Sequence, residues 1–349
     1  MATIEAIRVL SIAMLSFFIA IGLTVIFIKV IKKIGVTKQI RVSDEAPVFA
    51  RLHEKKAGTP TMGGIIIWLT VIVLAAGFWM LHKFFGGVFS FFNFVDRAET
   101  FLPLAAMIIA AGLGLIDDLM GAMKIGPHGG GLQVRHKLIF YAAIALLGAW
   151  WFYYRLDWDV LLVPFWGYIS VGSWYIPIFI FIIIASAFSA NETDGLDGLA
   201  GGVMLFALLA LTVVSFAMGR YHLATFGSAM VGAILAFLWF NIYPAKFFMG
   251  DTGSMALGIT MGIVAMLTNA TLFLPLFAPI LVIESLSVII QMASKKIWGK
   301  KIFLSTPIHH HYEAIGWPET QITMRYWNIS AIFCALGLAL FFLNRYVIL

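Results

Sequence analysis

The chain consists of long apolar runs separated by short polar islands. Most runs have roughly the length that an α-helix needs to cross the hydrocarbon core of a bilayer, about 20 residues, if modest tilt or bilayer thinning is allowed. The pattern therefore predicts an all-α polytopic membrane protein, with residues 1–349 forming a single integral-membrane domain. Ten spans are expected, at residues 9–31, 62–81, 101–116, 138–154, 175–190, 199–218, 223–243, 254–274, 276–293 and 327–344.

The composition excludes a water-soluble fold, because 62% of the residues are hydrophobic and only 11% are charged. The first apolar run meets its lysines at its C-terminal end and is followed by no small-residue cleavage site. We therefore expect a retained helix and not a signal peptide. The one cysteine, Cys334, lies inside an apolar run and can form neither an intramolecular disulfide nor a cysteine-based metal site.

The distribution of lysine and arginine orients the spans. An even number of spans puts both termini on the same side, and that side carries 6 basic residues against 16 on the other. Because basic loops are retained in the cytoplasm, the 16-residue side is predicted to be cytoplasmic, with both termini facing outward. Two aromatic stretches, 84–94 and 158–174, do not fit the spanning pattern and are expected as interfacial hairpins or short helices on the outer face.

Acidic residues adjoin the predicted cytoplasmic ends of several spans. Asp117 and Asp118 are adjacent at such an end, where two carboxylates repel each other unless a cation or a proton intervenes. Asp194 and Asp197 are three residues apart in the motif at 191–198 and would share one face of a helix. The alternatives are solvated loop acids that cap a neighbouring helix for the first pair, and a turn with N-caps for the second.

Two further polar groups lie at the same predicted face. Asp251 stands among glycines and hydroxyls at a predicted helix start, where backbone N–H groups can also face an anion; an ordinary N-cap is the alternative. His309, His310 and His311 are consecutive, so their side chains point in different directions and suit a phosphate or sugar better than zinc. A solvated loop patch is the alternative for the histidines.

Together these groups favour phosphoryl-transfer chemistry. Carboxylates could hold Mg²⁺, while histidines, lysines and helix ends could hold a diphosphate, and the reaction then depends on positioning and charge neutralisation. A secondary transporter is the competing class. Transporters tend to place acids near the bilayer midplane and to show repeated halves, whereas only Glu284 is a midplane candidate and no repeat is seen.

Six motifs follow one another along the chain, at residues 58–64, 117–118, 191–198, 248–251, 284–287 and 307–313. In this order they resemble the motifs of the polyprenyl-phosphate sugar-1-phosphate transferases, and the resemblance covers nearly the whole chain. The Gly-Thr-Pro-Thr-Met-Gly-Gly stretch and the histidine triplet point to the muramoyl-pentapeptide branch over the N-acetylhexosamine branch of this family.

The resemblance implies a ten-helix homodimer in the bacterial cytoplasmic (inner) membrane, with Mg²⁺ as cofactor, the lipid bilayer around it and no nucleic-acid partner. It also implies the reaction. The phosphate of undecaprenyl phosphate attacks the sugar-linked phosphate of UDP-N-acetylmuramoyl-pentapeptide, which releases UMP and forms lipid I, the first lipid-linked precursor of peptidoglycan. The alternative within the family is transfer from UDP-N-acetylglucosamine, with the same metal chemistry and a different sugar pocket.

The resemblance further implies roles for individual residues. Asp251 would be the principal Mg²⁺ ligand, and Asp117 the catalytic carboxylate, acting either as a base or as a covalent nucleophile. Asp118 would lie near the metal and the lipid phosphate, with Asp117 and Asp118 as further candidate metal ligands, and Lys137 near the phosphates. The expected substrate contacts are Asn191, Asp194, Asp197, Asn241, Phe248 stacked on uracil, Gln291, His309, His310, His311 and Lys56 or its neighbour Lys55.

Three further features need an explanation. Glu192 occupies a position that is usually apolar in the family, where it could alter metal or uridine binding or merely face water. Glu284 stands in an apolar run, where an ionisable group is a functional candidate, although helix packing or a structural hydrogen bond explains it equally well. Gly258 and Gly262 have GxxxG spacing, which we attribute to helix packing within one subunit, with a dimer face as the alternative.

Overall fold

The structure is a computed structural model, and it describes residues 2–34, 58–95, 97–126 and 130–348. Within these ranges, eight helices are long and apolar enough to cross a membrane, which confirms the all-α polytopic class. They are α1 (Ala2–Ile34), α3 (Ile65–Phe85), α5 (Ala98–Ala122), α6 (Val134–Trp150, continued by the π-helix η3 at Trp151–Arg155), α7 (Tyr175–Thr193), α8 (Leu199–Ala217), α9 (Tyr221–Asn241) and α14 (Glu319–Ile348).

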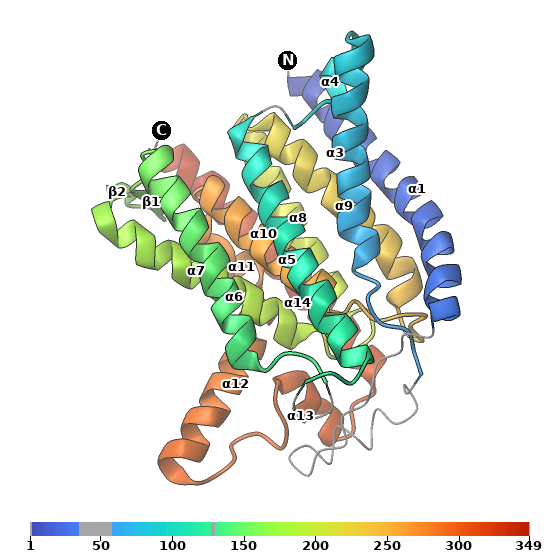
Figure 1. Ribbon diagram of the computed structural model, residues 1–349. Helices are drawn as coiled ribbons and strands as arrows, with labels where there is room; N and C mark the ends of the chain where they lie inside the picture. The colour runs from blue at the N-terminus through green and yellow to red at the C-terminus, as the bar shows by residue number, and fades with distance from the viewer. Residues whose placement is uncertain (1, 35–57, 96, 127–129, 349) are drawn as a thin grey trace.

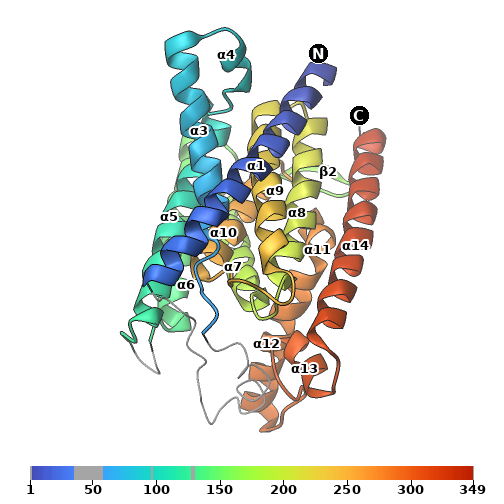
Figure 2. The same ribbon diagram turned by 90° about the vertical axis from the view of Figure 1, so that its right-hand side faces the viewer.

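These helices form a bundle with two distinct ends (Figure 1). Both ends of the chain lie at one end of the bundle, as the turned view also shows (Figure 2). The helices α12 (Pro279–Trp298) and α13 (Ile308–Ala314) lie at the other end. This arrangement agrees with the expected location of both termini on one side, while the side of the cell membrane that each end faces stays a prediction.

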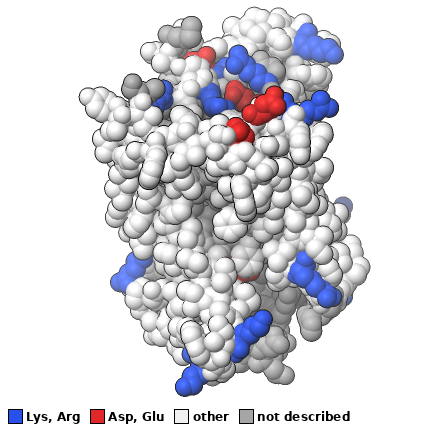
Figure 3. All heavy atoms as spheres, turned by 90° about the vertical axis from the view of Figure 1, so that its left-hand side faces the viewer, with Lys and Arg blue, Asp and Glu red and all other residues white. Residues whose placement is uncertain are grey.

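Charged side chains on the face seen in Figure 3 gather towards the two ends of the bundle, and a broad uncharged belt separates them. Such a belt is what helices in a bilayer require, because a charged side chain in hydrocarbon is costly.

One predicted span is shorter in the structure. The run expected at 254–274 corresponds to α10 (Asp251–Leu267), an apolar helix of 17 residues. It ends just before Asn269, whose φ of 53° is incompatible with a continuing right-handed helix. The expected span continued past this end because the polar residues after α10 are few and a second apolar stretch begins again at Leu272.

The span expected at 276–293 is part of a broken element. It consists of two arms that meet at an angle of 91°. The first arm is the 3₁₀-helix η5 (Thr271–Phe273) with the short helix α11 (Leu274–Phe277), and the second is α12. The break falls at Ala278, directly before Pro279, where proline disfavours the α conformation of the preceding residue. The described helices thus give eight spans, or nine if the broken element counts as one, and the total of ten stays a prediction.

The two aromatic stretches take the expected short forms. The first contains the five-residue helix α4 (Val88–Phe92). The second contains an antiparallel hairpin of β1 (Val160–Val163) and β2 (Gly167–Ser170), in which Val160 pairs with Ser170, followed by the 3₁₀-helix η4 (Gly172–Trp174).

Helix α10 lies in the core, and each of its residues from Thr252 to Leu267 is buried. It packs closely on α7, because a Cβ added at Gly258 would lie only 2.7 Å from the Cβ of Ala190. Gly262 likewise faces Ser186 of α7. The GxxxG spacing therefore serves packing within one subunit, as predicted, and it brings the start of α10 beside the end of α7.

Candidate active site

Helices α5 and α7 end, and α6 and α10 begin, at the end of the bundle opposite the chain termini. They bring together Asp117, Asp118, Lys137 and Asp251, which we call the carboxylate–lysine cluster. The Nζ of Lys137 lies 2.8 Å from Oδ2 of Asp117 and forms a second ion pair with Asp251. One ammonium group thus offsets the repulsion between two carboxylates. The side chain of Asp251 is still 21% exposed, so the cluster is accessible to a ligand.

Asp118 caps the first turn of α10. Its Oδ1 accepts a hydrogen bond from the N–H of Asp251 at 3.1 Å, and its Oδ2 accepts one from the N–H of Thr252 at 3.0 Å. A carboxylate is favourable there because the first N–H groups of a helix have no partner within it. Gly250 makes room, since a Cβ at this residue would lie 2.5 Å from Oδ2 of Asp118. Asp118 therefore does cap a neighbouring helix, although it lies within α5 and not in a solvated loop, and its place near the metal stays a prediction.

The glycine-rich motif at 58–64 packs against the start of α10 and the segment before it. The N–H of Gly63 donates to the carbonyl of Phe248 at 2.8 Å, and the N–H of Phe248 donates back to the carbonyl of Pro60 at 2.8 Å. A Cβ at Gly64 would lie 2.2 Å from the Cα of Gly253. The two backbones can approach this closely only because position 64 is glycine.

Asn191, near the end of α7, reaches into the cluster. Its Nδ2 donates to Oδ1 of Asp251 at 2.7 Å and to Oγ of Ser254 at 3.1 Å. Asp194 contacts the backbone just before α10, where its Oδ2 accepts a hydrogen bond from the N–H of Gly250 at 3.1 Å. The structure therefore brings Asn191 to the predicted metal ligand and places Asp194 next to it.

Asp197 and Asn241 are buried and bind backbone groups. Oδ2 of Asp197 accepts a hydrogen bond from the N–H of Ala245 at 2.9 Å. Oδ1 of Asn241 accepts one from the N–H of Gly198 at 3.1 Å, and its Nδ2 donates to the carbonyl of Phe247 at 2.9 Å. Both side chains hold the loop between α9 and α10, and this loop carries Phe248.

The remaining predicted contacts differ in their surroundings. Gln291 is buried in α12, and its Nε2 donates to the carbonyl of Phe303 at 2.8 Å, so it holds the loop before α13. Phe248 is half-buried, in contrast to Phe247, which is fully buried in the core, so part of the Phe248 ring is accessible. Lys55 and Lys56 lie outside the described residues.

Two of the three histidines belong to a second polar cluster, which we call the histidine–glutamate chain. Nδ1 of His309 lies 2.9 Å from Oε2 of Glu284, and the Nε2 atoms of His309 and His310 lie 3.1 Å apart. Nδ1 of His310 lies 2.7 Å from Oε2 of Glu313. A Cβ at Gly195 would lie 2.2 Å from Nε2 of His309, so the imidazole packs on the backbone of the motif at 191–198.

The charge of Glu284 acts directly on His309, and both side chains are 0% exposed. Burial acts to lower the pKa of His309, but the carboxylate of Glu284 outweighs it and raises that pKa above its ordinary value. His311 points elsewhere, and its Nδ1 accepts a hydrogen bond from the N–H of Leu304 at 3.2 Å. The triplet thus does not converge on one ligand, as the differing directions of consecutive side chains predicted.

One residue that faces the carboxylate–lysine cluster, Tyr141, was not recognised from the sequence. Tyr141 follows Lys137 by one turn of α6, and its hydroxyl lies in the electrostatic field of Asp117, Asp251 and Glu192. The four-residue spacing from Lys137 was the available signal, but a tyrosine in an apolar run is usually part of the core.

The carboxylates of the cluster fit a Mg²⁺ ion whose coordination shell is completed by the substrate. Asp117 and Asp251 both reach the same ammonium group, so their oxygens converge on one small volume. In the part of the chain that the structure describes, no group of three or more His, Cys, Asp or Glu side chains forms a closed metal site. Mg²⁺ commonly takes one or two carboxylates and completes its shell with water and substrate phosphates.

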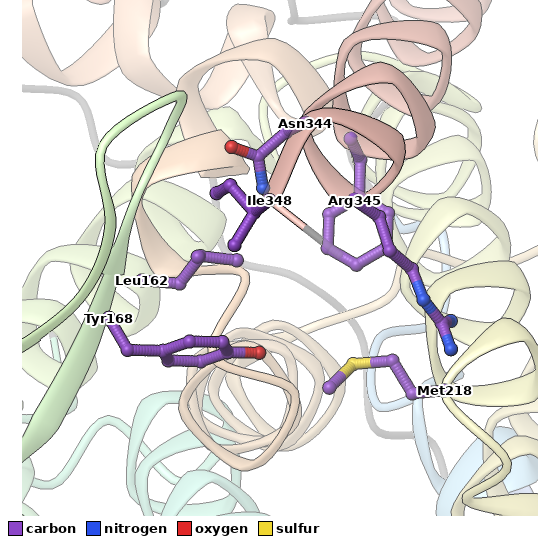
Figure 4. A pocket seen from close by; sticks show the side chains of 7 residues that line it. Leu162, Tyr168, Met218, Asn344, Arg345 and Ile348 are labelled. Atoms are coloured by element: carbon purple, nitrogen blue, oxygen red, sulfur yellow. The ribbon is translucent and has the colours of Figure 1, made fainter.

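A separate cavity of about 170 Å³ lies at the opposite end of the bundle (Figure 4). It lies between the β1–β2 hairpin and the last turns of α8 and α14, far along these helices from the carboxylate–lysine cluster. It therefore does not contribute to this candidate active site. Its lining residues are Leu162, Tyr168, Met218, Phe341, Asn344, Arg345 and Ile348.

The class of protein follows from the family model that this chain matches. Residues 100–269, which carry Asp117, Lys137, Asn191 and Asp251, match the model of glycosyl transferase family 4. The apolar helices of the chain and its bacterial relatives show that it is a multi-pass protein of the bacterial cytoplasmic membrane.

Individual relatives define the family more narrowly. Residues 56–67 match signature 1 of phospho-N-acetylmuramoyl-pentapeptide-transferase. Enzymes of that name from Geobacillus thermodenitrificans and from a second Geobacillus strain are 39% and 38% identical, each over 96% of this chain and 98% of the relative. The enzyme from Chloroflexus aurantiacus is 38% identical over 82% of this chain and 78% of its own length.

The chain therefore belongs to the phospho-N-acetylmuramoyl-pentapeptide-transferase family. This confirms the resemblance to the polyprenyl-phosphate sugar-1-phosphate transferases and the choice of the muramoyl-pentapeptide branch, and it makes the protein a membrane-bound transferase.

Proposed function

We propose that this enzyme transfers phospho-N-acetylmuramoyl-pentapeptide from UDP-N-acetylmuramoyl-pentapeptide to undecaprenyl phosphate, with Mg²⁺ as cofactor. The products are UMP and lipid I, so the enzyme acts at the first membrane step of peptidoglycan synthesis. The observation that carries the proposal is the pair of carboxylates, Asp117 and Asp251, that share the ammonium group of Lys137. The names of the relatives support the choice of substrates.

In the reaction, the lipid phosphate replaces UMP at the sugar-linked phosphorus, so that one phosphoanhydride bond is exchanged for another. An oxygen of the lipid phosphate forms a bond to the sugar-linked phosphorus, and the bond from that phosphorus to the bridging oxygen breaks, so that UMP leaves with the bond electrons. The negative charge on the phosphates is the main obstacle, because it repels both the lipid phosphate and the carboxylates. Lys137 supplies a positive charge at this position, held by two ion pairs.

The metal ion would be held by Asp251 and Asp117, with Asn191 orienting Asp251 through its hydrogen bond of 2.7 Å. When bound, Mg²⁺ neutralises phosphate charge and orients the phosphoryl group. Asp118 supports this arrangement from α10, since it fixes the backbone at Asp251 by two hydrogen bonds. Asp117 is the catalytic carboxylate in this proposal. As a base it would accept the proton of the lipid phosphate before the direct attack; as a nucleophile it would first displace UMP from the sugar-linked phosphorus and would then itself be displaced by the lipid phosphate.

The other proposed substrate contacts lie outside the carboxylate–lysine cluster. The accessible ring of Phe248 would stack on uracil, as an aromatic face can. His311, the one histidine of the triplet that is not buried, would contact the nucleotide sugar, whereas the buried His309 and His310 would support it from within α13. Asp194, Asp197, Asn241 and Gln291 would shape the pocket through the backbone segments that they hold.

A homodimer is a further part of this proposal, and it rests on the family resemblance. Light scattering coupled to size-exclusion chromatography in detergent tests it directly. A protein mass of twice 38.6 kDa after subtraction of the detergent is expected, and a mass of a single chain would contradict it.

Release of UMP by the purified protein tests the proposed reaction. The protein in detergent is supplied with undecaprenyl phosphate, Mg²⁺ and either UDP-N-acetylmuramoyl-pentapeptide or UDP-N-acetylglucosamine, and each reaction is repeated with EDTA. Turnover of the first nucleotide alone, abolished by EDTA and restored by Mg²⁺, is the expected result.

Turnover of UDP-N-acetylglucosamine alone would refute the proposed donor and retain the metal chemistry. Turnover that persists in excess EDTA would refute the role of Mg²⁺. Absence of turnover with both nucleotides, in a sample that is folded by its melting curve, would contradict the proposed function.

A further inference from the structure

The hydroxyl of Tyr141 is a buried polar group that the proposed mechanism does not use. Tyr141 is only 1% exposed, and its Oη has no hydrogen-bond partner among the residues that the structure describes. A buried hydroxyl without a partner is unfavourable, because it has given up water and gained nothing in return. Such a group in a native structure suggests a partner that binds at this position.

The direction of the hydroxyl identifies the site that it serves. Tyr141 lies one turn after Lys137 on α6, so both side chains leave the same face of the helix. The charges that act on the hydroxyl are those of Asp251, Asp117 and Glu192. Tyr141 therefore faces the carboxylate–lysine cluster, yet it forms a hydrogen bond with none of these three carboxylates.

Tyr175 shows that burial alone does not account for this arrangement. It is also 1% exposed, on α7, near the η4 end of the bundle and far along that helix from the cluster. No carboxylate charge acts on its hydroxyl, and its oxygen is not among the unpartnered buried atoms. Tyr175 thus provides a matched control that keeps the burial and lacks the neighbouring carboxylates.

We propose that the hydroxyl of Tyr141 donates a hydrogen bond to a non-bridging oxygen of the phosphoryl group that is transferred. This inference rests on the proposed function. The transferred group must lie beside Lys137 and the carboxylates that would hold the metal, and the hydroxyl faces that volume from the adjacent turn of α6. Lys137 would supply charge, and Tyr141 a directed donor that is already oriented before the substrate arrives.

Substitution Tyr141→Phe tests the inference, because it removes only the hydroxyl. The full-length protein in detergent is compared with wild type in kcat/KM for UDP-N-acetylmuramoyl-pentapeptide and in its affinity for UMP. A hydrogen bond to a charged group predicts a loss in kcat/KM of about 10-fold to 100-fold. UMP lacks the transferred phosphoryl group, so its affinity should change by less than about twofold.

Tyr175→Phe is the control and should retain kcat/KM within about twofold of wild type. Wild-type kcat/KM in Tyr141→Phe would overturn the inference and leave the proposed function standing. Equal losses in kcat/KM and in UMP affinity would also overturn it, because they indicate a structural role. Inactive wild-type protein would instead refute the proposed function, so the two failures are distinguishable.

Glu192 provides a second measurement, since the hydroxyl could instead serve this carboxylate from α7. In a double-mutant cycle with Glu192→Gln, independent losses support a phosphate partner for Tyr141. If Glu192→Gln alone reproduces the loss of Tyr141→Phe, and the double variant loses nothing more, the partner of the hydroxyl is Glu192 and the inference is wrong.

Discussion

The carboxylate–lysine cluster and the histidine–glutamate chain use similar groups in opposite ways. Each combines carboxylates with basic nitrogen atoms, and both lie at the same end of the bundle. Asp251 keeps 21% of its side chain exposed and shares Lys137 with Asp117, whereas Glu284 and His309 are 0% exposed and bind each other. The first cluster can therefore exchange or add a ligand, and the second is closed.

The difference indicates that the first cluster is suited to bind ligands and the second to stabilise the fold. In an open cluster, a lysine that bridges two carboxylates provides a place where a cation and phosphates can bind. In a closed cluster, a buried ion pair fixes the segments that carry it, here α12 and α13, against Gly195 of the motif after α7. We expect changes in the first cluster to remove catalysis and changes in the second to affect stability first.

The largest expected effect comes from Asp251→Asn. This substitution removes the charge that would hold Mg²⁺ and that pairs with Lys137, and it leaves the hydrogen bonds of the backbone at this position intact. We expect Mg²⁺-dependent UMP release to fall on the order of 10³-fold, with a melting temperature within a few degrees of wild type. Retention of near-full turnover would refute the metal assignment and remove the contrast between the two clusters.

Asp117→Asn should produce the next largest effect. Asp117 pairs with Lys137 at 2.8 Å but does not cap α10, so the fold should tolerate the change. We expect kcat to fall on the order of 10²-fold to 10³-fold at saturating substrates. Asp118→Asn serves as the comparison, because it should affect the start of α10 and hence stability as well as turnover. A change confined to KM in Asp117→Asn would contradict a catalytic role.

Phe248→Ala tests the nucleotide side of the open cluster. Loss of the half-buried ring removes the proposed stacking surface for uracil, and we expect the affinity for UMP to fall about 10-fold. Isothermal titration with UMP measures this effect. Phe92→Ala, which removes a half-buried ring from α4 at the opposite end of the bundle, is the control and should leave the UMP affinity nearly unchanged. Equal affinities for Phe248→Ala and wild type would rule out stacking.

Glu284→Gln should have the smallest effect on turnover and a measurable effect on stability. Because the pKa of His309 is raised in the folded protein, the pairing stabilises the fold below the unfolded pKa, about 6.5, and this stability is lost as the pH rises through the folded pKa. The neighbouring carboxylates Glu313 and Glu192 act on His309 in the same direction.

We therefore expect the melting temperature of Glu284→Gln to lie below that of wild type at about pH 6, and the difference to shrink at about pH 9. Asp251→Asn is the matched control, since it removes a carboxylate from the other cluster and should not show this dependence on pH. A deficit that is constant from acidic to alkaline pH would contradict the pairing with a charged imidazole.

Much of the architecture could be predicted because spans are local in sequence. Each described span overlaps a predicted one, since burial in hydrocarbon requires a continuous apolar run. The break at Ala278 and the early end of α10 were missed because the polar stretch after α10 is only a few residues long and lies between two apolar runs. The local signals were Asn269 between two threonines, and Pro279.

The family resemblance assigned Asp117, Lys137, Asn191 and Asp251 to one site, and the structure brings these four side chains together. Their catalytic and metal-binding roles stay predictions. The sequence did not distinguish side chains that face the site from those that hold the backbone around it, such as Asp197, Asn241 and Gln291, because both kinds are polar residues near span ends.

Pairings across the fold were beyond reach from the sequence. The partner of Glu284 is His309, which lies on another helix. Of the interpretations offered for Glu284, the structure therefore shows the structural hydrogen bond. Glycine at position 195 is explained only once the imidazole of His309 is seen against it.

Binding of Mn²⁺ as a paramagnetic substitute for Mg²⁺ tests the division between the two clusters most directly. Electron paramagnetic resonance of the purified protein with UDP-N-acetylmuramoyl-pentapeptide reports bound Mn²⁺ in wild type, Asp251→Asn and Glu284→Gln. We predict that Asp251→Asn loses the bound-metal signal and that Glu284→Gln retains it. Loss of the signal in Glu284→Gln with retention in Asp251→Asn would contradict the assignment of the carboxylate–lysine cluster as the catalytic centre.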